Sequence, residues 1–574
     1  MDYHAFRYAT RMLQIAARER DKASRDMHEE AVAPANARQL DEAGADAAGY
    51  AKLAASLNAA ERYGEAIRIC RKGLELYPRE AAIHRELGWA LGESNRTDEA
   101  IAAAESAALE LSNPHFMATT RYLALPVVYE NVREIAEWRS RFTEGLRRLI
   151  AETDLEDPVA LDMARNDIAP QFYLAYHGLN DMPLLREYGR LTAQIMSASY
   201  PDFTHPRSTS PIAADARIRV GYIFAEKPGI NGLFAAWMKD LDPARFEVVC
   251  FQVGGTVGPE WHDVKAAATQ FHHLPEELER ICQCVAENRI DVLVYLYVGM
   301  GSLWSQLAGL RVAPIQCAAW GHPITTGLPT IDYFISNELM EPHDADAHYS
   351  ESLIRLPGIG VSPAPAFLPP VTKTRSDFGL PADAVLYISP HASAKYLPQY
   401  DYVFAAIAAR VESALFVLID PPAPEIGALI RRRLGAAFAR AGLKYERFIR
   451  FLPRQSYYDY LDLMRGSDIF LDTFGWSGGL TTLDAVRCGL PVVTCPGDLM
   501  RGRQSAGILK QLEITDTIAT NADEYVEIAV RLGLDHGWRE QVAHQVHERQ
   551  DRLFHDRSFL PALEEFFSRA AGKG

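Results

Sequence analysis

The chain has 574 residues, which is too long for a single hydrophobic core and predicts roughly three or four structural units. Hydrophobic residues make up 48% and charged residues 23%, a composition that excludes a chain disordered over most of its length. The 59 basic and 75 acidic residues leave a formal net charge of −16, which argues against a nucleic-acid partner.

The N-terminal segment, Met1 to Arg20, mixes charged and apolar residues, and no apolar run approaches the length of about 18 residues that a membrane span requires. We therefore expect a cytoplasmic protein without a membrane span. The cysteines are scattered and lie mostly in apolar segments, so we expect buried thiols: Cys70, Cys250, Cys282, Cys284, Cys317, Cys488 and Cys495. They show no zinc-finger spacing, and we expect no metal site.

A repeat with an offset of 34 residues lies between about residues 49 and 114. The matching pairs are Leu53 with Leu87, Arg62 with Arg96, Glu65 with Glu99, and Ala66 with Ala100. Each copy predicts a helix, a turn near Tyr63-Gly64 or Thr97-Asp98, and a second helix, which resembles the tetratricopeptide repeat. Flanking helices near 5–30 and 116–200 are needed to complete such a stack, because each unit buries its apolar face only against a neighbour. The alternative is an ordinary helical bundle with chance self-similarity.

A segment rich in Pro, Ser, Thr and His follows at 201–216 and predicts a linker. Beyond it, short apolar runs alternate with amphipathic stretches, the pattern of parallel sheets covered on both faces. The predicted strands are Ile218–Phe224, Phe246–Val253, Asp291–Val298, Pro314–Trp320, Val385–Ser389, Ala414–Ile419, Asp468–Thr473 and Val492–Thr494.

A second Pro-, Thr- and Ser-rich stretch from Leu368 to Phe378 divides this α/β part into two similar halves. The sequence thus predicts an α-helical repeat domain followed by two Rossmann-like α/β domains that face a cleft. The expected boundaries are 1–200 for the helical, acceptor-selecting domain, 201–216 for the linker, 217–372 and 373–555 for the two Rossmann-like domains, and 556–574 for a C-terminal helix.

The richest candidate for ligand binding is the segment Asp472–Asp484, which follows a predicted strand. Its glycines permit tight turns, and a helix is expected to begin near Thr481, where free backbone N–H groups would attract a diphosphate. Asp484, one turn further on, could accept hydrogen bonds from ribose hydroxyls. The alternative is a plain helix capped by Ser and Thr residues.

A second candidate is the segment Ala313–Tyr333, in which a predicted strand ends in a loop of Gly, Pro, Thr and His before another strand starts. Loops of this kind contact ligands more often than they support cores.

These two segments, with Tyr349-Ser350-Glu351, Leu356-Pro357 and Leu490–Gly497, resemble glycosyltransferase family 41. That family includes O-linked N-acetylglucosamine transferases, plant relatives that transfer fucose, and bacterial adhesin N-glucosyltransferases. The resemblance covers about 217–567, and the family usually carries helical repeats upstream. It implies a GT-B fold, a UDP-sugar donor held mainly by the second Rossmann-like domain, and inversion at the anomeric carbon without a metal or other cofactor.

The resemblance also implies residue roles. Lys395, in His391-Ala392-Ser393-Ala394-Lys395, matches the lysine that neutralises the leaving diphosphate, a charge that a metal-free site must stabilise with fixed donors. The expected donor-binding residues are His391, Tyr460, Gly478, Gly479, Thr481, Thr482, Asp484 and Arg503. Of these, Tyr460 would stack on the uracil and Arg503 would support the phosphate region. Gly479 replaces a histidine common in the family, so fewer donor contacts are expected.

The chain departs from the family after its first strand of the α/β part, where Ile230-Asn231 stands in place of a His-Pro pair. The histidine of that pair has been considered a catalytic base or a sugar contact. Here His322, in the second ligand segment, becomes the candidate base because its ordinary pKa suits general-base work. The alternative is a purely structural histidine.

The leading hypothesis is transfer of a hexose or N-acetylhexosamine from a UDP-sugar to Ser or Thr of a protein. The alternatives are transfer of glucose to Asn of a bacterial protein, a helical-repeat scaffold with weak catalysis, and an epimerase of the GT-B fold. The expected partners are the UDP-sugar and a bacterial protein or peptide acceptor, with a flagellin or surface protein as an example. A homo-oligomer is left open.

Overall fold

The computed structural model describes residues 46–204, 216–225, 228–258, 261–363 and 368–572. The helix expected near 5–30 and most of the linker at 201–216 lie outside these residues. The backbone of Ile230 and Asn231 belongs to a helix, but their side chains also lie outside the described part. Within it, no helix is long and apolar enough to cross a membrane.

The described residues form two compact units. Unit 1 contains the chain up to Leu149 together with 420–432 and 453–458, and unit 2 contains the remainder. The helices in the N-terminal part of unit 1 are α2 (Ala47–Ala59), α3 (Tyr63–Leu76), α4 (Ala81–Glu93), α5 (Thr97–Glu110), α6 (Ala118–Leu123) and α7 (Val132–Glu152).

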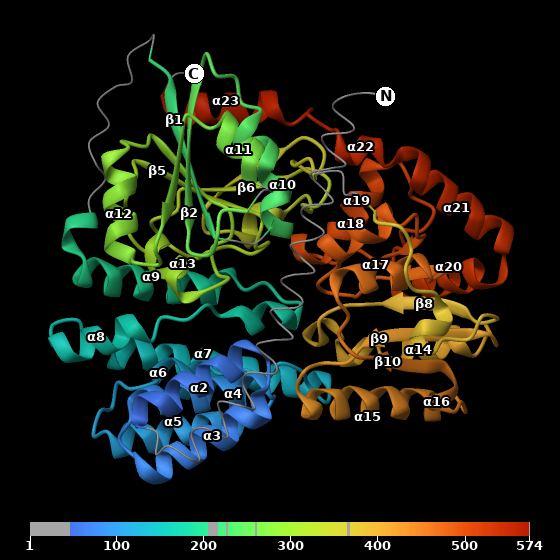
Figure 1. Ribbon diagram of the computed structural model, residues 1–574, viewed down its shortest axis with the longest axis horizontal. Coiled ribbons are helices and arrows are strands. Elements are labelled where there is room, and N and C mark those ends of the chain that lie inside the picture. Colours follow the sequence, from blue (N-terminus) through green and yellow to red (C-terminus); the bar gives the residue numbers. More distant parts are fainter. Residues whose placement is uncertain (1–45, 205–215, 226–227, 259–260, 364–367, 573–574) are drawn as a thin grey trace. The chain divides into compact units, whose positions relative to one another are not determined.

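The predicted repeat is present in unit 1 as two helix pairs, α2–α3 and α4–α5 (Figure 1). Equivalent residues have equivalent contacts: Arg62 binds Glu65, and Arg96 binds Glu99. Ala66 and Ala100 are both buried, as close helix packing requires. The turns lie three residues earlier than predicted, at 60–62 and 94–96, so Tyr63 and Thr97 begin the second helices instead of forming the turns.

Unit 2 begins with α8 (Pro158–Asn166), the 3-10 helix η1 (Phe172–His177) and α9 (Met182–Ser199). A seven-stranded parallel sheet follows, in the order β3-β2-β1-β4-β5-β6-β7. Its strands are β1 (Ile218–Ala225), β2 (Phe246–Val253), β3 (Gln270–Leu274), β4 (Val292–Tyr295), β5 (Ile315–Ala319), β6 (Tyr333–Asn337) and β7 (Ser352–Leu356). The helices between them are α10 (Pro228–Lys239), α11 (His262–Ala267), α12 (Leu278–Glu287) and α13 (Ser302–Ala308).

The second sheet is also parallel and has the order β10-β9-β8-β11-β12. Its strands are β8 (Val385–Ser389), β9 (Ala414–Ile419), β10 (Ile449–Leu452), β11 (Ile469–Leu471) and β12 (Val492–Val493). The helices of this half are α14 (Tyr402–Ala408), α15 (Pro424–Arg440), α16 (Tyr445–Phe448), α17 (Tyr457–Arg465), α18 (Leu480–Arg487), α19 (Gln504–Gln511) and α20 (Ala522–Leu534). The expected class, helical repeats followed by two Rossmann-like sheets of the GT-B type, is therefore confirmed.

The chain ends with α21 (His536–Arg549), α22 (Asp551–Phe554) and α23 (Leu560–Ala570). Helix α23 packs on the first sheet half, because Glu564 binds Arg245 and Phe567 contacts Phe246. The expectation of buried thiols holds for five cysteines, whereas Cys488 and Cys495 are half-buried; all seven are free.

Candidate active site

The second sheet reverses its strand order at β8 and β11, which are neighbours. The loop after β8 carries His391 and Lys395, and the loop after β11 is the 472–479 loop, which leads into α18. Ligands of open α/β sheets bind in the crevice at the carboxyl ends of strands where the order reverses. The topology thus brings the two predicted donor segments together where a ligand is expected.

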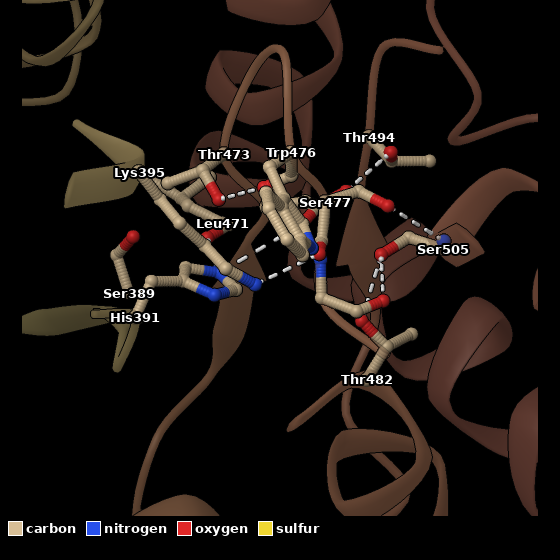
Figure 2. A network of polar contacts seen from close by, with 12 residues as sticks. Ser389, His391, Lys395, Leu471, Thr473, Trp476, Ser477, Thr482, Thr494 and Ser505 are labelled. Carbon is tan, nitrogen blue, oxygen red and sulfur yellow. Dashed lines mark hydrogen bonds and ion pairs between the residues drawn. The ribbon is translucent and has the colours of Figure 1, made fainter. Parts of the chain in front are cut away.

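Lys395 is half-buried beside the 472–479 loop. Its Nζ donates to the carbonyl oxygen of Ser477 at 2.9 Å and lies 5.8 Å from the centroid of the Trp476 ring (Figure 2). Burial lowers the pKa of Lys395 to about 8, and the negative charge of Asp472 opposes this shift. The side chain is therefore mostly an ammonium at pH 7, and it has three N–H donors to share with an anion.

The carboxylate of Asp472 organises the loop from within. It accepts hydrogen bonds from Gly478 N and from Thr494 Oγ1, both at 2.7 Å (Figure 2). Burial raises the pKa of Asp472, and the hydrogen bonds that it accepts oppose the rise. The Lys395 ammonium binds the carbonyl oxygen of Ser477, and Gly478 is the next residue. The hydrogen bonds of Asp472 therefore fix the position of the ammonium.

His391 lies below Lys395, with Nε2 3.2 Å from Leu471 O and 3.8 Å from Asp472 Oδ1. Burial and the Lys395 ammonium lower the pKa of His391 well below its ordinary value, so that the imidazole is neutral at pH 7. His391 is buried behind Lys395 and is not among the residues that line the cavity described below.

Helix α18 begins at Leu480, one residue before the predicted start, and no side chain caps it. The N–H groups of Leu480, Thr481 and Thr482 have no acceptor among the described residues. The hydroxyl oxygen of Thr481 is buried and likewise has no hydrogen-bond partner there. Free N–H groups and the positive end of the helix dipole make this terminus suitable for an anion.

A cavity of about 250 Å³ lies between the two sheet halves within unit 2. The second half contributes Lys395, Trp476, Gly479, Leu480, Thr481, Leu483, Gln504 and Ile508 to its wall. The first half contributes Leu233, Met300, Trp320, Gly321, His322, Pro323, Met340, Ile359 and Val361, and η1 adds Phe172 and Tyr176. The structure thus brings four predicted site residues, Lys395, His322, Gly479 and Thr481, to one cavity.

His322 belongs to the wall that the first sheet half contributes, is 7% exposed and lies within a group of aromatic rings. It stacks on Phe172 at 5.7 Å between centroids, and the Trp476 ring is 5.9 Å away. Gly299 (φ +92°) makes room for the imidazole, because a Cβ there would lie 2.9 Å from its Cδ2. The ring is held rigidly beside the space that a reacting group would occupy.

Glu351 holds the loop that follows His322. Its carboxylate accepts hydrogen bonds from Thr325 Oγ1 at 2.6 Å and from Thr326 N at 2.7 Å. In the sequence, Tyr349-Ser350-Glu351 was noted only as part of the family resemblance, with no role for Glu351. The structure shows that Glu351 holds this loop through hydrogen bonds. It is a positioning residue for the loop.

The other predicted donor residues surround the cavity without lining it. Thr482 Oγ1 pairs with Ser505 Oγ at 2.7 Å, and Asp484 binds Arg487 at 2.9 Å. Arg503 donates to Met340 O at 3.0 Å and to Gly497 O at 2.9 Å, and burial lowers its pKa. Tyr460 lies half-buried in α17. Their roles toward ribose, uracil and phosphate stay predictions.

Sequence reasoning gave no role to Trp476, Tyr176 or Gln504, all of which line the cavity. Trp476 lies in a quoted motif, and its ring stacks on Tyr176 at 4.4 Å. Tyr176 comes from the helical region, where no local pattern distinguishes it from a core aromatic residue. Among the described residues, no three His, Cys, Asp or Glu side chains are grouped as metal ligands would be.

The match of the sequence to a known protein family agrees with this geometry. The model of glycosyl transferase family 41 matches residues 189–359 and 367–563, which is more than half of the chain. The chain belongs to glycosyl transferase family 41. The expected resemblance is thereby confirmed, and the two matched segments include every residue of the cavity wall except Phe172, Tyr176 and Val361.

Similar family 41 proteins include the plant protein called probable UDP-N-acetylglucosamine–peptide N-acetylglucosaminyltransferase SPINDLY. The Arabidopsis thaliana protein is 32% identical over 261 residues, which are 45% of this chain and 28% of the relative. The rice protein is 27% identical over 376 residues, covering 61% of this chain and 37% of the relative. The chain thus spans only about a third of the length of these relatives.

Among solved structures, a mutant O-GlcNAc transferase of Thermobaculum terrenum is similar in fold to the family 41 chain. It is 21% identical, covers 98% of both chains and has a TM-score of 0.67. At this identity the likeness concerns the fold: helical repeats followed by two Rossmann-like halves.

Proposed function

We propose that this chain is an inverting glycosyltransferase that moves a hexose or N-acetylhexosamine from a UDP-sugar to Ser or Thr of a protein. Membership of family 41 supports glycosyl transfer, and the names of the plant relatives support a UDP-sugar donor and a peptide acceptor. The helical repeats of unit 1 support a polypeptide acceptor, because such stacks offer extended surfaces for peptides.

One observation carries the proposal. The Lys395 ammonium, the hydroxyl of Thr481 and the start of α18 open onto the same cavity. When a sugar leaves a nucleotide diphosphate, negative charge grows on the phosphate oxygen that was bonded to the anomeric carbon. Fixed donors aimed at that oxygen stabilise the transition state without rearrangement, and we assign this role to Lys395 and the α18 N-terminus.

The chemistry requires an acceptor oxygen to attack the anomeric carbon from the face opposite the diphosphate. A bond forms to the acceptor oxygen, the bond to the phosphate oxygen breaks, and the acceptor proton passes to a base. His322 lines the same cavity from the first sheet half, whereas Lys395 lines it from the second, and His322 is our candidate for that base. No metal is required in this scheme, because the leaving charge meets Lys395 and backbone N–H groups.

The test is UDP release on mixing the full chain with UDP-sugars and a lysate of protein acceptors, followed by peptide mass spectrometry. We expect UDP release with at least one UDP-hexose or UDP-N-acetylhexosamine, modification of Ser or Thr, and unchanged rates in EDTA. Modification of Asn would replace the acceptor part of the proposal. No UDP release with any donor would overturn the enzymatic function.

A further inference from the structure

Gln504 is the first residue of α19 and faces the cavity, although it is only 5% exposed. Its carboxamide makes no hydrogen bond with any described residue. The amide is not one of the fully buried polar groups that lack a partner, so its atoms are accessible from the cavity that Gln504 lines. A ligand in the cavity would supply the missing partner.

The position of Gln504 is fixed by its neighbour Ser505. Ser505 Oγ donates to Gly478 O at 3.0 Å and pairs with Thr482 Oγ1 at 2.7 Å, and Ser505 N donates to Ser477 Oγ at 3.2 Å (Figure 2). These contacts fasten the start of α19 to the 472–479 loop. The Gln504 side chain therefore lies at a defined place beside the start of α18.

Gly479, the residue that precedes α18, leaves the space that the Gln504 carboxamide occupies. A Cβ on Gly479 would overlap Gln504 Oε1. We expect fewer donor contacts at Gly479, because it replaces a histidine common in the family. In this chain the Gln504 amide, which comes from α19, occupies the space beside Gly479. Rotation of the carboxamide by half a turn exchanges its Nε2 and Oε1, so its N–H groups can be directed toward an anion at the α18 terminus.

From this geometry we infer that Gln504 binds the diphosphate of the nucleotide, donating from Nε2 to a phosphate oxygen at the N-terminus of α18. The inference rests on the proposed function, because it assumes a nucleotide diphosphate in the cavity. The three free N–H groups of α18 and Lys395 bind the same group, and Gln504 adds a donor from a different helix.

The test is calorimetric titration of the full chain with UDP and with uridine. The variant Gln504→Met keeps the length of the side chain and removes the amide. We expect UDP to bind about tenfold more weakly to this variant, in the range for a lost hydrogen bond to a charged group, while uridine binds as before. Gln504→Glu places a negative charge there and should weaken UDP binding further.

Gln511→Met serves as the matched control. Gln511 ends the same helix, bonds to Arg552 O and Asp556, and does not line the cavity, so its variant should bind UDP normally. UDP affinity of Gln504→Met within twofold of the wild type would overturn the inference, as would an equal loss for UDP and uridine. A wild-type chain that binds no UDP would instead overturn the proposed function, and this inference with it.

Discussion

The Lys395 side chain is half-buried, and its loss of water disfavours the charged ammonium. Asp472, whose charge favours the ammonium, is itself buried and accepts hydrogen bonds from Gly478 and Thr494. Burial of a lysine is unfavourable for the charged form, so this position is maintained at some cost in stability. A functional role accounts for that cost, because perturbed pKa values gather at sites that act on charged groups.

Replacement of Lys395 by Met should therefore lower turnover strongly and preserve the fold. Loss of one fixed donor to a developing oxyanion lowers kcat by about 100- to 1000-fold, and Met has similar length without a charge to bury. Transfer rates and the unfolding temperature of Lys395→Met should be compared with those of Lys444→Met, a change at an exposed lysine. Normal turnover by Lys395→Met would reject the role.

The pH dependence should report the same ammonium. The pKa of Lys395 is lowered to about 8, so the protonated, active form is complete below that pH and is lost as pH rises through it. We expect kcat/KM to fall tenfold per pH unit above about pH 8, since kcat/KM reports the free enzyme. A bound diphosphate favours the ammonium, so kcat should fall only at higher pH. A flat kcat/KM profile between pH 7 and 10 would contradict this assignment.

At the scale of elements, η1 and the residues that connect it to α9 are attached to the second sheet half by Arg501, which forms a buried ion pair with Asp181 of that connection. Arg501 and Asp181 are 4% and 1% exposed and lie 2.8 Å apart, and Arg501 also donates to Ala175 O at 2.9 Å and to Leu179 O at 2.6 Å. Since η1 carries Phe172 and Tyr176, this attachment sets the position of two cavity walls relative to each other.

Asp181→Ala should be strongly destabilising. The Arg501 charge would be left buried and uncompensated, at a cost of about 3–5 kcal/mol. The free energy of unfolding, measured in urea, should be compared with that of Glu412→Ala. This control removes one partner of the exposed Glu412–Arg447 ion pair and should lower the free energy of unfolding by less than about 1 kcal/mol. Equal effects of the two changes would mean that the buried pair does not hold η1.

Close backbone contact fixes another element of the site. Helix α9 packs on the loop after His322 at Gly327, whose φ is +73° and where a Cβ would overlap Leu185 O. Only glycine combines this conformation with this approach. The Gly-Leu-Pro run in the second ligand segment is thus explained by packing against α9, which the sequence pattern did not indicate.

For the whole molecule, nucleotide binding should stabilise unit 2, because the cavity lies within it. A ligand that binds only the folded state at 100 times its Kd adds about 2.7 kcal/mol. Differential scanning calorimetry should show a higher midpoint with UDP for the transition that includes unit 2. The shift should be smaller for Lys395→Met, and an unchanged midpoint at saturating UDP would argue against the donor site.

The sequence by itself determined the elements whose pattern is local. The strands Phe246–Val253, Val385–Ser389 and Ala414–Ile419 match prediction to the residue, because interior parallel strands are buried on both faces and read as continuous apolar runs. Of the strands absent from the predicted list, β3, β7 and β10 are at sheet edges, where half-exposed faces admit polar residues. The fourth, β6, is interior, and only its start was expected, at the end of the second ligand segment. The repeat was visible because equivalent residues, such as Arg62 and Arg96, keep the same local contacts.

Only the tertiary structure decided which side chains meet at the cavity. Lys395 and Thr481 were predictable, because both follow strands of one sheet and the ends of parallel strands share an edge. Tyr176 reaches Trp476 across 300 residues of sequence, and Arg501 reaches Asp181 across 320. Gln504 faces the cavity only because Ser505 fastens its helix to the 472–479 loop. Contacts between distant segments depend on how packed layers fit together, and no local pattern of residues records that fit.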